Sequence, residues 1–236
     1  MIMLFIFLTI TTVKAQLFGT QDMIEEENIS LKTWAEDNIN NYAGIYSFGE
    51  SEAESSLHLS ISDRIICAQL KKGDWVFKSG QTIGWHFTYE NYTNVKIIEN
   101  NFYSDQSNGE FVSFKHNNKQ YKGLKLFNPP IQMGNNGEFE IGSFSEVDKL
   151  GKYFKTKTEV LSIGNLKKKN KEELKIMRNE IYARYHYLFK TKKMSDHFNK
   201  QEWYTGYYQN VDSFLTEIEN ENIKKIRTVE KKAHNN

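Results

Sequence analysis

The sequence feature that most constrains the fold is a series of short segments, all between Tyr42 and Phe144, in which apolar and polar residues alternate. A period of two is typical of β-strands with one buried face. Turn residues such as Gly73 and Gly109 separate the segments, at a spacing that leaves no room for the helices that parallel strands need. The alternating segments are residues 42–48, 57–61, 83–89, 95–98, 110–114 and 121–127.

We therefore predict an antiparallel β domain over residues 42–149, a meander of about eight strands that curls into a barrel or a two-layer sandwich. Neither Pro129 nor Pro130 can donate a hydrogen bond to a strand ladder, so the pair ends the sheet or marks its last edge. After a glycine-containing loop at residues 134–137, residues 138–144 are expected to supply one more strand.

In the C-terminal part the period changes to that of an α-helix. Asn170 and Glu173 have the spacing of a capping box, and apolar residues then recur three or four positions apart. A short helical turn is expected around Met194 and a last helix from about Asp212. We predict a small all-α module over residues 150–236, so the fold class is α+β. The two apolar stripes are Leu174, Met177, Ile181, Tyr185 and Leu188, and then Leu215, Ile218, Ile226 and Val229.

Polar residues interrupt or border these stripes. Asn222 lies in the middle of the last stripe, where an unpaired amide would cost about 1–3 kcal/mol, and Glu219 lies at its edge. Arg178 and Arg184 flank the first stripe, so either can form a charge-assisted pair with Glu219. We predict that Tyr182, Glu219, Asn222 and the two arginines form a polar seam between the helices.

The C-terminal motifs are specific enough to indicate a family. They comprise Arg178-Asn179-Glu180-Ile181-Tyr182-Ala183-Arg184, then Phe189, Phe198, Gln201, Trp203 and Tyr204, and finally Ile218, Glu219, Asn222 and Ile223. With these motifs, residues 161–230 resemble the YARHG domain, although Tyr185 and His186 stand where that family has its histidine and glycine. The resemblance implies an exported bacterial protein in an envelope or extracellular setting, and it implies no established molecular function.

The first 41 residues are expected to contain a signal peptide and a polar leader. Residues 1–10 form an apolar run too short to span a bilayer as a helix, and Val13 and Ala15 precede a cleavage site before Gln16. We predict a signal peptide at residues 1–15, with an N-terminal membrane anchor as the alternative. In the leader, residues 16–41, Ser30 is expected to cap a short helix and Trp34 to pack onto the β domain. The mature protein is expected to be secreted or periplasmic.

Cysteine and charge limit the chemistry. Cys67 is the one cysteine, so no internal disulfide can form, and its apolar neighbours indicate a buried structural thiol. Basic residues outnumber acidic ones from residue 151 onward, and the reverse holds for residues 16–150. Such a division lets two domains dock on one another, or lets the basic half meet an anionic polymer of the envelope. Nucleic acid is not expected as a partner, because acidic residues are interspersed among the basic ones.

No motif predicts a metal site, a cofactor or a catalytic centre. The six histidines include no HExxH pair and no cysteine-assisted zinc set, and there is no GxSxG elbow, Walker loop or dinucleotide fingerprint. We expect no metal ion and no cofactor. Whether the protein is an enzyme stays open, because members of a catalytic triad need not be adjacent in sequence. By alternation His86 faces opposite Trp85 and Phe87 and is interpreted as facing solvent.

Three functional hypotheses follow. The leading one is an exported, non-enzymatic binding or interaction protein of the bacterial cell envelope. Its ligand would be an anionic envelope polymer or an acidic segment of another envelope protein, held in a C-terminal groove lined by Arg178, Arg184, Trp203 and Tyr204.

The second hypothesis is a β-barrel carrier of a small apolar or carbohydrate ligand, with the helical module as a structural cap. The third is an envelope hydrolase, which requires a nucleophile and a base within hydrogen-bond reach in a cleft. The aromatic lining of the carrier would comprise Tyr46, Trp75, Trp85, Tyr89 and Tyr103.

Overall fold

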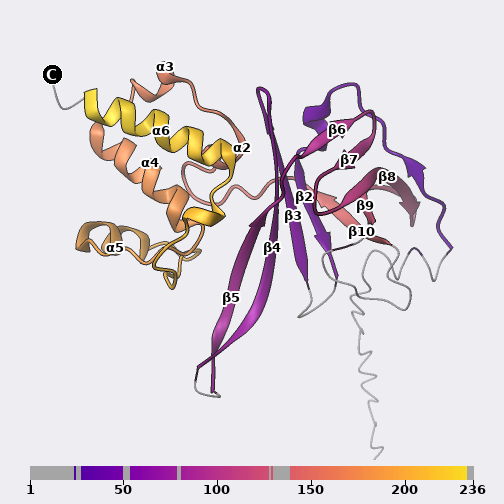
Figure 1. Cartoon of the computed structure of the whole chain (residues 1–236), viewed down its shortest axis with the longest axis horizontal. Helices are drawn as coiled ribbons and strands as arrows, with labels where there is room; N and C mark the ends of the chain where they lie inside the picture. The colour runs from indigo at the N-terminus through magenta and orange to yellow at the C-terminus, as the bar shows by residue number, and fades with distance from the viewer. Residues whose placement is uncertain are drawn as a thin grey trace, which may run out of the picture.

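A computed structural model of the chain describes residues 24, 28–49, 54–78, 81–127, 129 and 139–232. A large β-sheet and a helical module lie side by side (Figure 1). The expected signal peptide, most of the leader before residue 28, Pro130 and the loop at residues 134–137 lie outside the described residues. Strands come first and helices after them, which confirms the predicted α+β class.

The strands form one ten-stranded antiparallel sheet. Its order is β5-β4-β3-β2-β10-β9-β8-β7-β6, and β1 pairs with β8 beside this path. Because β2 pairs with β10, two meanders meet in the middle of the sheet. The strands are β1 (Lys32–Thr33), β2 (Gly44–Phe48), β3 (Ser55–Ser62), β4 (Ile65–Lys78), β5 (Gln81–Asn91), β6 (Lys96–Ile98), β7 (Asn101–Tyr103), β8 (Asn108–His116), β9 (Lys119–Phe127) and β10 (Phe139–Ser145).

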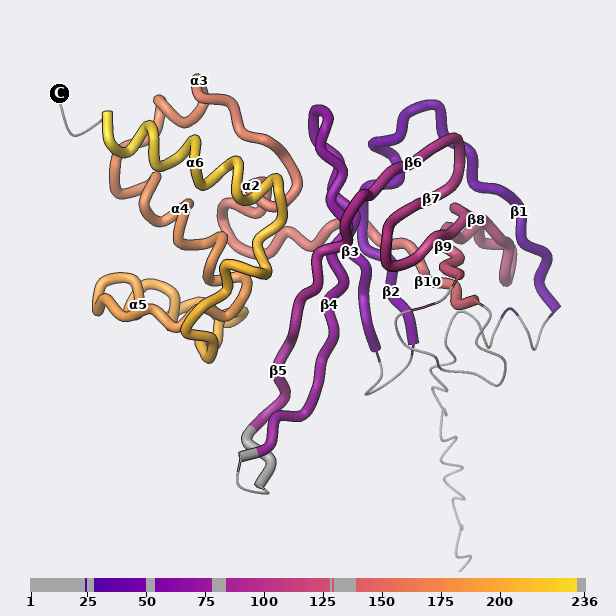
Figure 2. The backbone as a smooth tube through the Cα atoms, in the orientation of Figure 1, coloured from indigo at the N-terminus to yellow at the C-terminus, as the bar shows by residue number. Residues whose placement is uncertain are grey.

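The inner face of the sheet holds the main apolar core. Tyr46 on β2, Leu57 on β3, Phe111 on β8 and Leu124 on β9 are fully buried in one cluster. Since these strands lie in both halves of the sheet, the sheet must bend over the core, as the backbone trace shows (Figure 2). Within the described residues β5 and β6 each pair with one strand only, so the sheet is not closed and a barrel is not confirmed.

Residues 31–37 of the leader are extended rather than helical. They contain β1 and no helix, so the prediction of a short helix after Ser30 is wrong. Pairing with β8 is favoured because it carries Trp34 into the core, where this residue is 4% exposed and its ring meets that of Tyr42 edge-on at 4.9 Å. The 3₁₀ helix η1 (Ile39–Tyr42) then leads into β2.

The helical module begins after β10 and is organised by two long antiparallel helices, α4 and α6. The capping box of α4 forms as its spacing predicts: Asn170 Oδ1 accepts from the N–H of Glu173 at 2.9 Å, and Glu173 Oε2 accepts from the N–H of Asn170 at 3.3 Å. Leu188 does not extend the buried stripe, since α4 ends at Ala183 and Leu188 is 46% exposed. The helices of the described residues are α2 (Lys155–Thr158), α3 (Ile163–Leu166), α4 (Lys171–Ala183), α5 (Lys192–Phe198), η3 (Asp212–Phe214) and α6 (Glu217–Lys232).

The module docks on the outer face of the sheet through polar side chains that reach backbone carbonyls. Gln69 Nε2 donates to the carbonyl of Phe214 at 2.5 Å, and Asn91 Nδ2 lies 3.2 Å from that carbonyl and 3.1 Å from that of Leu215. Burying these amides without partners would be costly, so the contacts fix where the module sits. The division into domains at residue 150 stays a prediction, because sheet and helices share this interface.

Two tyrosines of the module cover the free edge of the sheet. Tyr207 Oη accepts from the N–H of Phe87 at 3.0 Å, and Tyr208 Oη donates to the carbonyl of Phe87 at 3.1 Å. An edge strand otherwise presents such unpaired groups to other chains. The contacts therefore protect β5 and hold the module against it.

Candidate functional site

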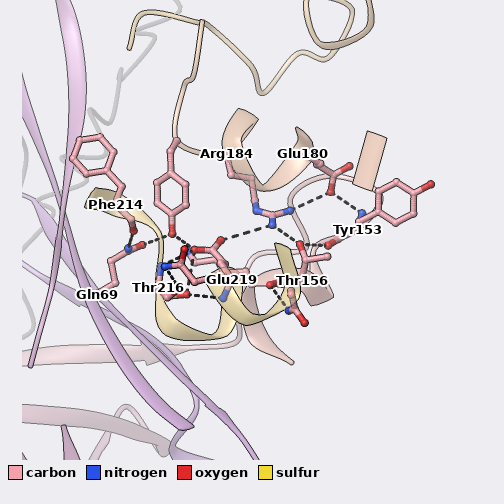
Figure 3. Close-up of polar contacts among 12 residues, drawn as sticks. Gln69, Tyr153, Thr156, Glu180, Arg184, Phe214, Thr216 and Glu219 are labelled. Atoms are coloured by element: carbon pink, nitrogen blue, oxygen red, sulfur yellow. Dashed lines mark hydrogen bonds and ion pairs between the residues drawn. The ribbon is translucent and has the colours of Figure 1, made fainter. Parts of the chain in front are cut away.

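A buried polar network joins the helical module to the sheet (Figure 3). Its centre is Arg184, directly after α4, which is 8% exposed. Arg184 Nη1 lies 3.1 Å from Glu180 Oε1, and Nη2 lies 3.8 Å from Glu219 Oε1 and donates to Thr156 Oγ1. Glu219 is completely buried and Glu180 nearly so. Arg184 therefore compensates part of the charge of both buried carboxylates.

Tyr185 extends this network to β4. Its hydroxyl oxygen lies 2.6 Å from Glu219 Oε2 and 2.9 Å from Gln69 Oε1. The single hydroxyl proton goes to the charged carboxylate, which is the stronger acceptor. Burial, and then the negative charge of Glu219, raise the pKa of Tyr185 well above its usual value. Tyr185 thus stays protonated and serves as a structural link.

Asn222 ties α6 to the segment that precedes α3. Its Oδ1 accepts from the N–H of Leu161 at 2.8 Å, and its Nδ2 donates to the carbonyls of Thr156 at 2.9 Å and Glu159 at 2.7 Å. The amide therefore bridges α6 to α2 rather than to α4. Tyr182, also predicted in the seam, lies at its outer end, where its hydroxyl accepts a 3.4 Å hydrogen bond from Arg227.

The four residues predicted to line a ligand groove do not lie together. Arg184 is enclosed in the network, and Tyr204 is 7% exposed with its hydroxyl donated to a backbone carbonyl. Trp203 packs half-buried against a separate apolar cluster. Arg178 borders an open groove of about 380 Å³, and its Nε donates to Glu230 at 2.8 Å. Other residues of that groove are Tyr182, Tyr187, Val211, Asp212 and Arg227.

A cleft of about 680 Å³ opens on the outer face of the sheet, next to the docked module. Part of its lining is aromatic, from Trp75 on β4 and Trp85 and Phe87 on β5. The two indoles meet edge to face at 5.2 Å, and Trp75 is 42% exposed. Gly73 makes room for this arrangement, since a Cβ at that position would lie 2.3 Å from the Trp85 ring. The cleft thus presents aromatic surfaces that the strands hold in place.

The rest of the cleft is mostly polar. Ser56 Oγ lies 3.0 Å from His58 Nε2, and His58 Nδ1 lies 2.9 Å from the Nζ of Lys157, which comes from α2 of the module. Lys71 is the cross-strand partner of Ser56. Its Nζ lies 3.9 Å from the centroid of the Phe87 ring.

Burial lowers the pKa of three nitrogen groups at this polar end. The pKa of Lys157 falls to about 8. The pKa of His58 falls well below its usual value, through burial and then the charges of Lys157 and Lys71. Burial also lowers the pKa of Lys71, with Asp148 opposing the shift. His58 is therefore neutral at physiological pH. The pKa of Lys157, at about 8, lies just above physiological pH.

The turn after α4 has a backbone conformation that favours glycine, although a histidine occupies the position. His186 has a φ of +61°, in the left-handed region, and its Nδ1 lies 3.0 Å from the carbonyl of Thr205. The ring of Tyr207 is stacked between those of His86, at 3.8 Å, and His186, at 4.6 Å. His86 therefore packs against the module instead of facing solvent as predicted.

The capping box of α4 and the buried Glu219 and Asn222 of α6 agree with what the C-terminal motifs predict. Residues 152–231 match the family model of the YARHG domain. The match confirms the resemblance and begins before α2, so Lys157 lies within the YARHG domain. The domain points to an extracellular or periplasmic protein and names no molecular function. No curated protein and no solved structure matches the chain.

The described residues contain neither a membrane-spanning helix nor a metal-binding cluster of acidic, histidine or cysteine side chains. No helix among them is both long and apolar enough to cross a membrane. In that same part of the chain, no group of three or more His, Cys, Asp or Glu side chains is placed to hold a metal ion.

The five aromatic residues predicted to line a carrier's interior do not share one cavity. Tyr46 is fully buried in the inner core, whereas Trp75 and Trp85 lie in the cleft on the outer face. Tyr89 packs edge-on against Tyr185 of the YARHG domain, with ring centroids 4.7 Å apart. Tyr103 is 40% exposed.

Sequence reasoning misses the polar end of the cleft. Ser56 and His58 share a face of β3 by alternation, and this was the one usable signal. Lys157 is 99 residues further along the chain than His58, and no local pattern connects the two.

Proposed function

We propose that this protein is an exported binding protein of the bacterial cell envelope and that a saccharide occupies its sheet cleft. The observation that carries this proposal is the pair of tryptophans, Trp75 and Trp85, held edge to face in a cleft with a largely polar lining. The YARHG domain supports the setting, as does the apolar N-terminal segment that resembles a signal peptide.

The lining matches the two kinds of surface on a sugar ring. The C–H face of a sugar is apolar and packs on an aromatic ring, whereas its rim of hydroxyls needs hydrogen-bond partners. Trp75, Trp85 and Phe87 offer the first, and polar groups such as Ser56 and Asp148 offer the second. Ligand pockets typically measure about 300–1,000 Å³, a range that includes this cleft. A second hollow, of about 790 Å³ beside Cys67, has no tryptophan in its described lining.

Titration of the mature chain with soluble peptidoglycan fragments, followed by tryptophan fluorescence, tests the proposal. Trp75→Ala removes the exposed indole and should weaken binding by about tenfold or more, as expected for an aromatic anchor. The matched control is Phe77→Ala, because Phe77 is 64% exposed on the same strand and does not line the cleft. Equal affinity of Trp75→Ala and the wild type would exclude the cleft as the saccharide site.

A second candidate function follows from the groove that Arg178 borders. Arg227 lies exposed in this groove, while Arg178 is already paired with Glu230. Arg227 is therefore the cation available to an acidic segment of a partner protein. Isothermal titration with a polyglutamate peptide at low salt tests this function. Binding should be lost in Arg227→Met and kept in Trp75→Ala, and binding kept in Arg227→Met would exclude the groove.

A further inference from the structure

A serine and a histidine lie within hydrogen-bond reach of one another inside the cleft. Ser56 and His58 project from the same face of β3, with Ser56 Oγ 3.0 Å from His58 Nε2. An imidazole beside a hydroxyl activates it as a nucleophile only when the nitrogen that faces the hydroxyl carries no proton. The position of the proton on His58 therefore decides what the pair can do.

Lys157 controls that position. A charged ammonium can only donate, so at 2.9 Å from Lys157 Nζ the Nδ1 of His58 must accept, and the ring proton then sits on Nε2. In this state His58 donates to Ser56 and cannot take its proton. Once Lys157 is neutral, its amine accepts from Nδ1–H, and Nε2 becomes free to accept the hydroxyl proton of Ser56.

The surroundings of Lys157 favour loss of its proton at mildly alkaline pH. Burial is the largest influence and lowers its pKa to about 8. Two cations add to the shift and two carboxylates oppose it, so burial sets the direction. The charged groups that act on Lys157 are, in falling order, Glu219 on α6, Arg184 after α4, Lys71 on β4 and Asp148 after β10. The neutral imidazole of His58 on β3 faces it directly.

We infer that Ser56 is a nucleophile for acyl transfer from small carboxylic esters, with His58 as its general base and Lys157 as a positioning residue that sets the proton on His58. Ser56 Oγ forms a bond to the ester carbonyl carbon while its proton passes to His58 Nε2. His58 returns this proton to the leaving alkoxide as the ester C–O bond breaks, which leaves an acyl-serine and a free alcohol. Water, with His58 again as base, hydrolyses the acyl-serine to a carboxylic acid and regenerates the serine.

Lys71 places a positive charge beside the reacting carbonyl. It is the direct cross-strand partner of Ser56, and the Cβ atoms of such partners lie about 4.5–5.5 Å apart. Its side chain lines the same cleft, so its ammonium can stabilise the oxyanion of the tetrahedral intermediate. This activity goes beyond saccharide binding and does not require it, because a small ester reaches Ser56 through the same opening.

A fluorophosphonate, which phosphonylates activated serines, tests the inference in the mature protein. A lysine with a pKa of about 8 is roughly 3% neutral at pH 6.5 and roughly 90% neutral at pH 9. Labelling of Ser56, mapped by peptide mass spectrometry, should therefore be about thirtyfold faster at pH 9 than at pH 6.5. Hydrolysis of p-nitrophenyl acetate should follow the same pH profile and should be lost in Ser56→Ala.

Two substitutions of Lys157 separate proton control from a merely structural role. Lys157→Met removes the donor, so Ser56 should react at pH 6.5 about as fast as the wild type reacts at pH 9. Lys157→Arg stays charged and should keep Ser56 unreactive at both pH values. A reaction rate that did not respond to Lys157→Met, or a pH profile left unchanged by it, would overturn the inference.

The control residue is Ser47. It lies on β2, pairs directly with Ser56 of β3 and lines the same cleft. Ser47→Ala should leave labelling unchanged, and labelling of Ser47 as fast as that of Ser56 would also overturn the inference. Fluorophosphonate labelling measures the reactivity of Ser56, whereas the fluorescence titration measures saccharide binding at Trp75. The proposed acyl transfer and the proposed saccharide binding can therefore fail independently of one another.

Discussion

Replacing Arg184 with methionine should destabilise the fold far more than the same change at Arg178, although both arginines belong to the same helical segment and pair with glutamates of α6. The Arg184 side chain is 6% exposed and its partners Glu180 and Glu219 are 4% and 0% exposed. Removing one member of a buried ion pair costs about 3–5 kcal/mol, because the remaining charge has no compensation. Arg184→Met leaves two such carboxylates.

The pair of Arg178 and Glu230 is more open to water, with side chains 20% and 13% exposed. Screening by solvent reduces the value of such a pair, so we expect Arg178→Met to cost about 1 kcal/mol. Urea unfolding at pH 7 measures the free energy of unfolding of both variants. This free energy is the urea concentration at the transition midpoint multiplied by the dependence of the free energy on urea concentration. Equal losses for the two variants, or a loss below about 1 kcal/mol for Arg184→Met, would refute the assignment of Arg184 to a buried network.

The pH dependence of Arg184→Met provides a second check. Burial already raises the pKa of Glu180, and the charge of Arg184 opposes this shift, so without the guanidinium the pKa of Glu180 in the folded state should rise further above its value in the unfolded chain. The folded state then binds more protons than the unfolded state, so stability should fall as pH rises above about 4.3. The loss relative to the wild type is therefore expected to be larger at pH 8 than at pH 5. In the double variant with Glu219→Gln the loss should be smaller than the sum of the single losses.

Substitutions at three further positions test other parts of the structure. Asn222→Leu leaves the N–H of Leu161 and two carbonyls without partners and should cost at least about 2 kcal/mol, seen as a lower melting temperature; an unchanged melting temperature would contradict the bridge to α2. His186→Gly should be more stable than His186→Ala by about 1 kcal/mol in urea unfolding, because both lack the imidazole but only glycine adopts a φ of +61° without strain; the reverse order would contradict the left-handed turn. Lys157 has a folded-state pKa below that of the unfolded chain, so the stability of the wild type should rise between pH 8 and pH 10, and Lys157→Met should lack this rise in the same assay.

Local patterns predict most of the elements of this fold. Alternation over residues 42–144 identifies the antiparallel strands, and the spacing of Asn170 and Glu173 identifies the start of α4. Alternation cannot say which face of each strand is the inner one, because that depends on the register between strands. For this reason alternation places Tyr46 and Trp75 in one lining, although they lie on opposite faces of the sheet.

Local sequence patterns predict less about the candidate site than about the fold. Helical periodicity places both Arg178 and Arg184 at the border of the apolar stripe, and that geometry is the same whether the arginine faces a ligand or a buried acid. The difference arises from what packs against the helix. Arg184 contacts Glu219 of α6 on the side of the helices that faces the sheet, whereas Arg178 borders the open groove. Such information is tertiary and has no local signature.

The outer face of the sheet explains how the YARHG domain brings Lys157 to His58 in the cleft. Ser62, Gln69 and Asn91 are polar, as alternation predicts for a face in contact with water, yet the YARHG domain covers them. Polar side chains that reach specific backbone groups allow one docking position, because a shifted module would leave several of them buried without partners. That position brings Lys157 to within 2.9 Å of His58. The domain therefore supplies the lysine that contacts His58, and a change that loosens the docking should alter the reactivity of Ser56 before it unfolds the sheet or the helical module.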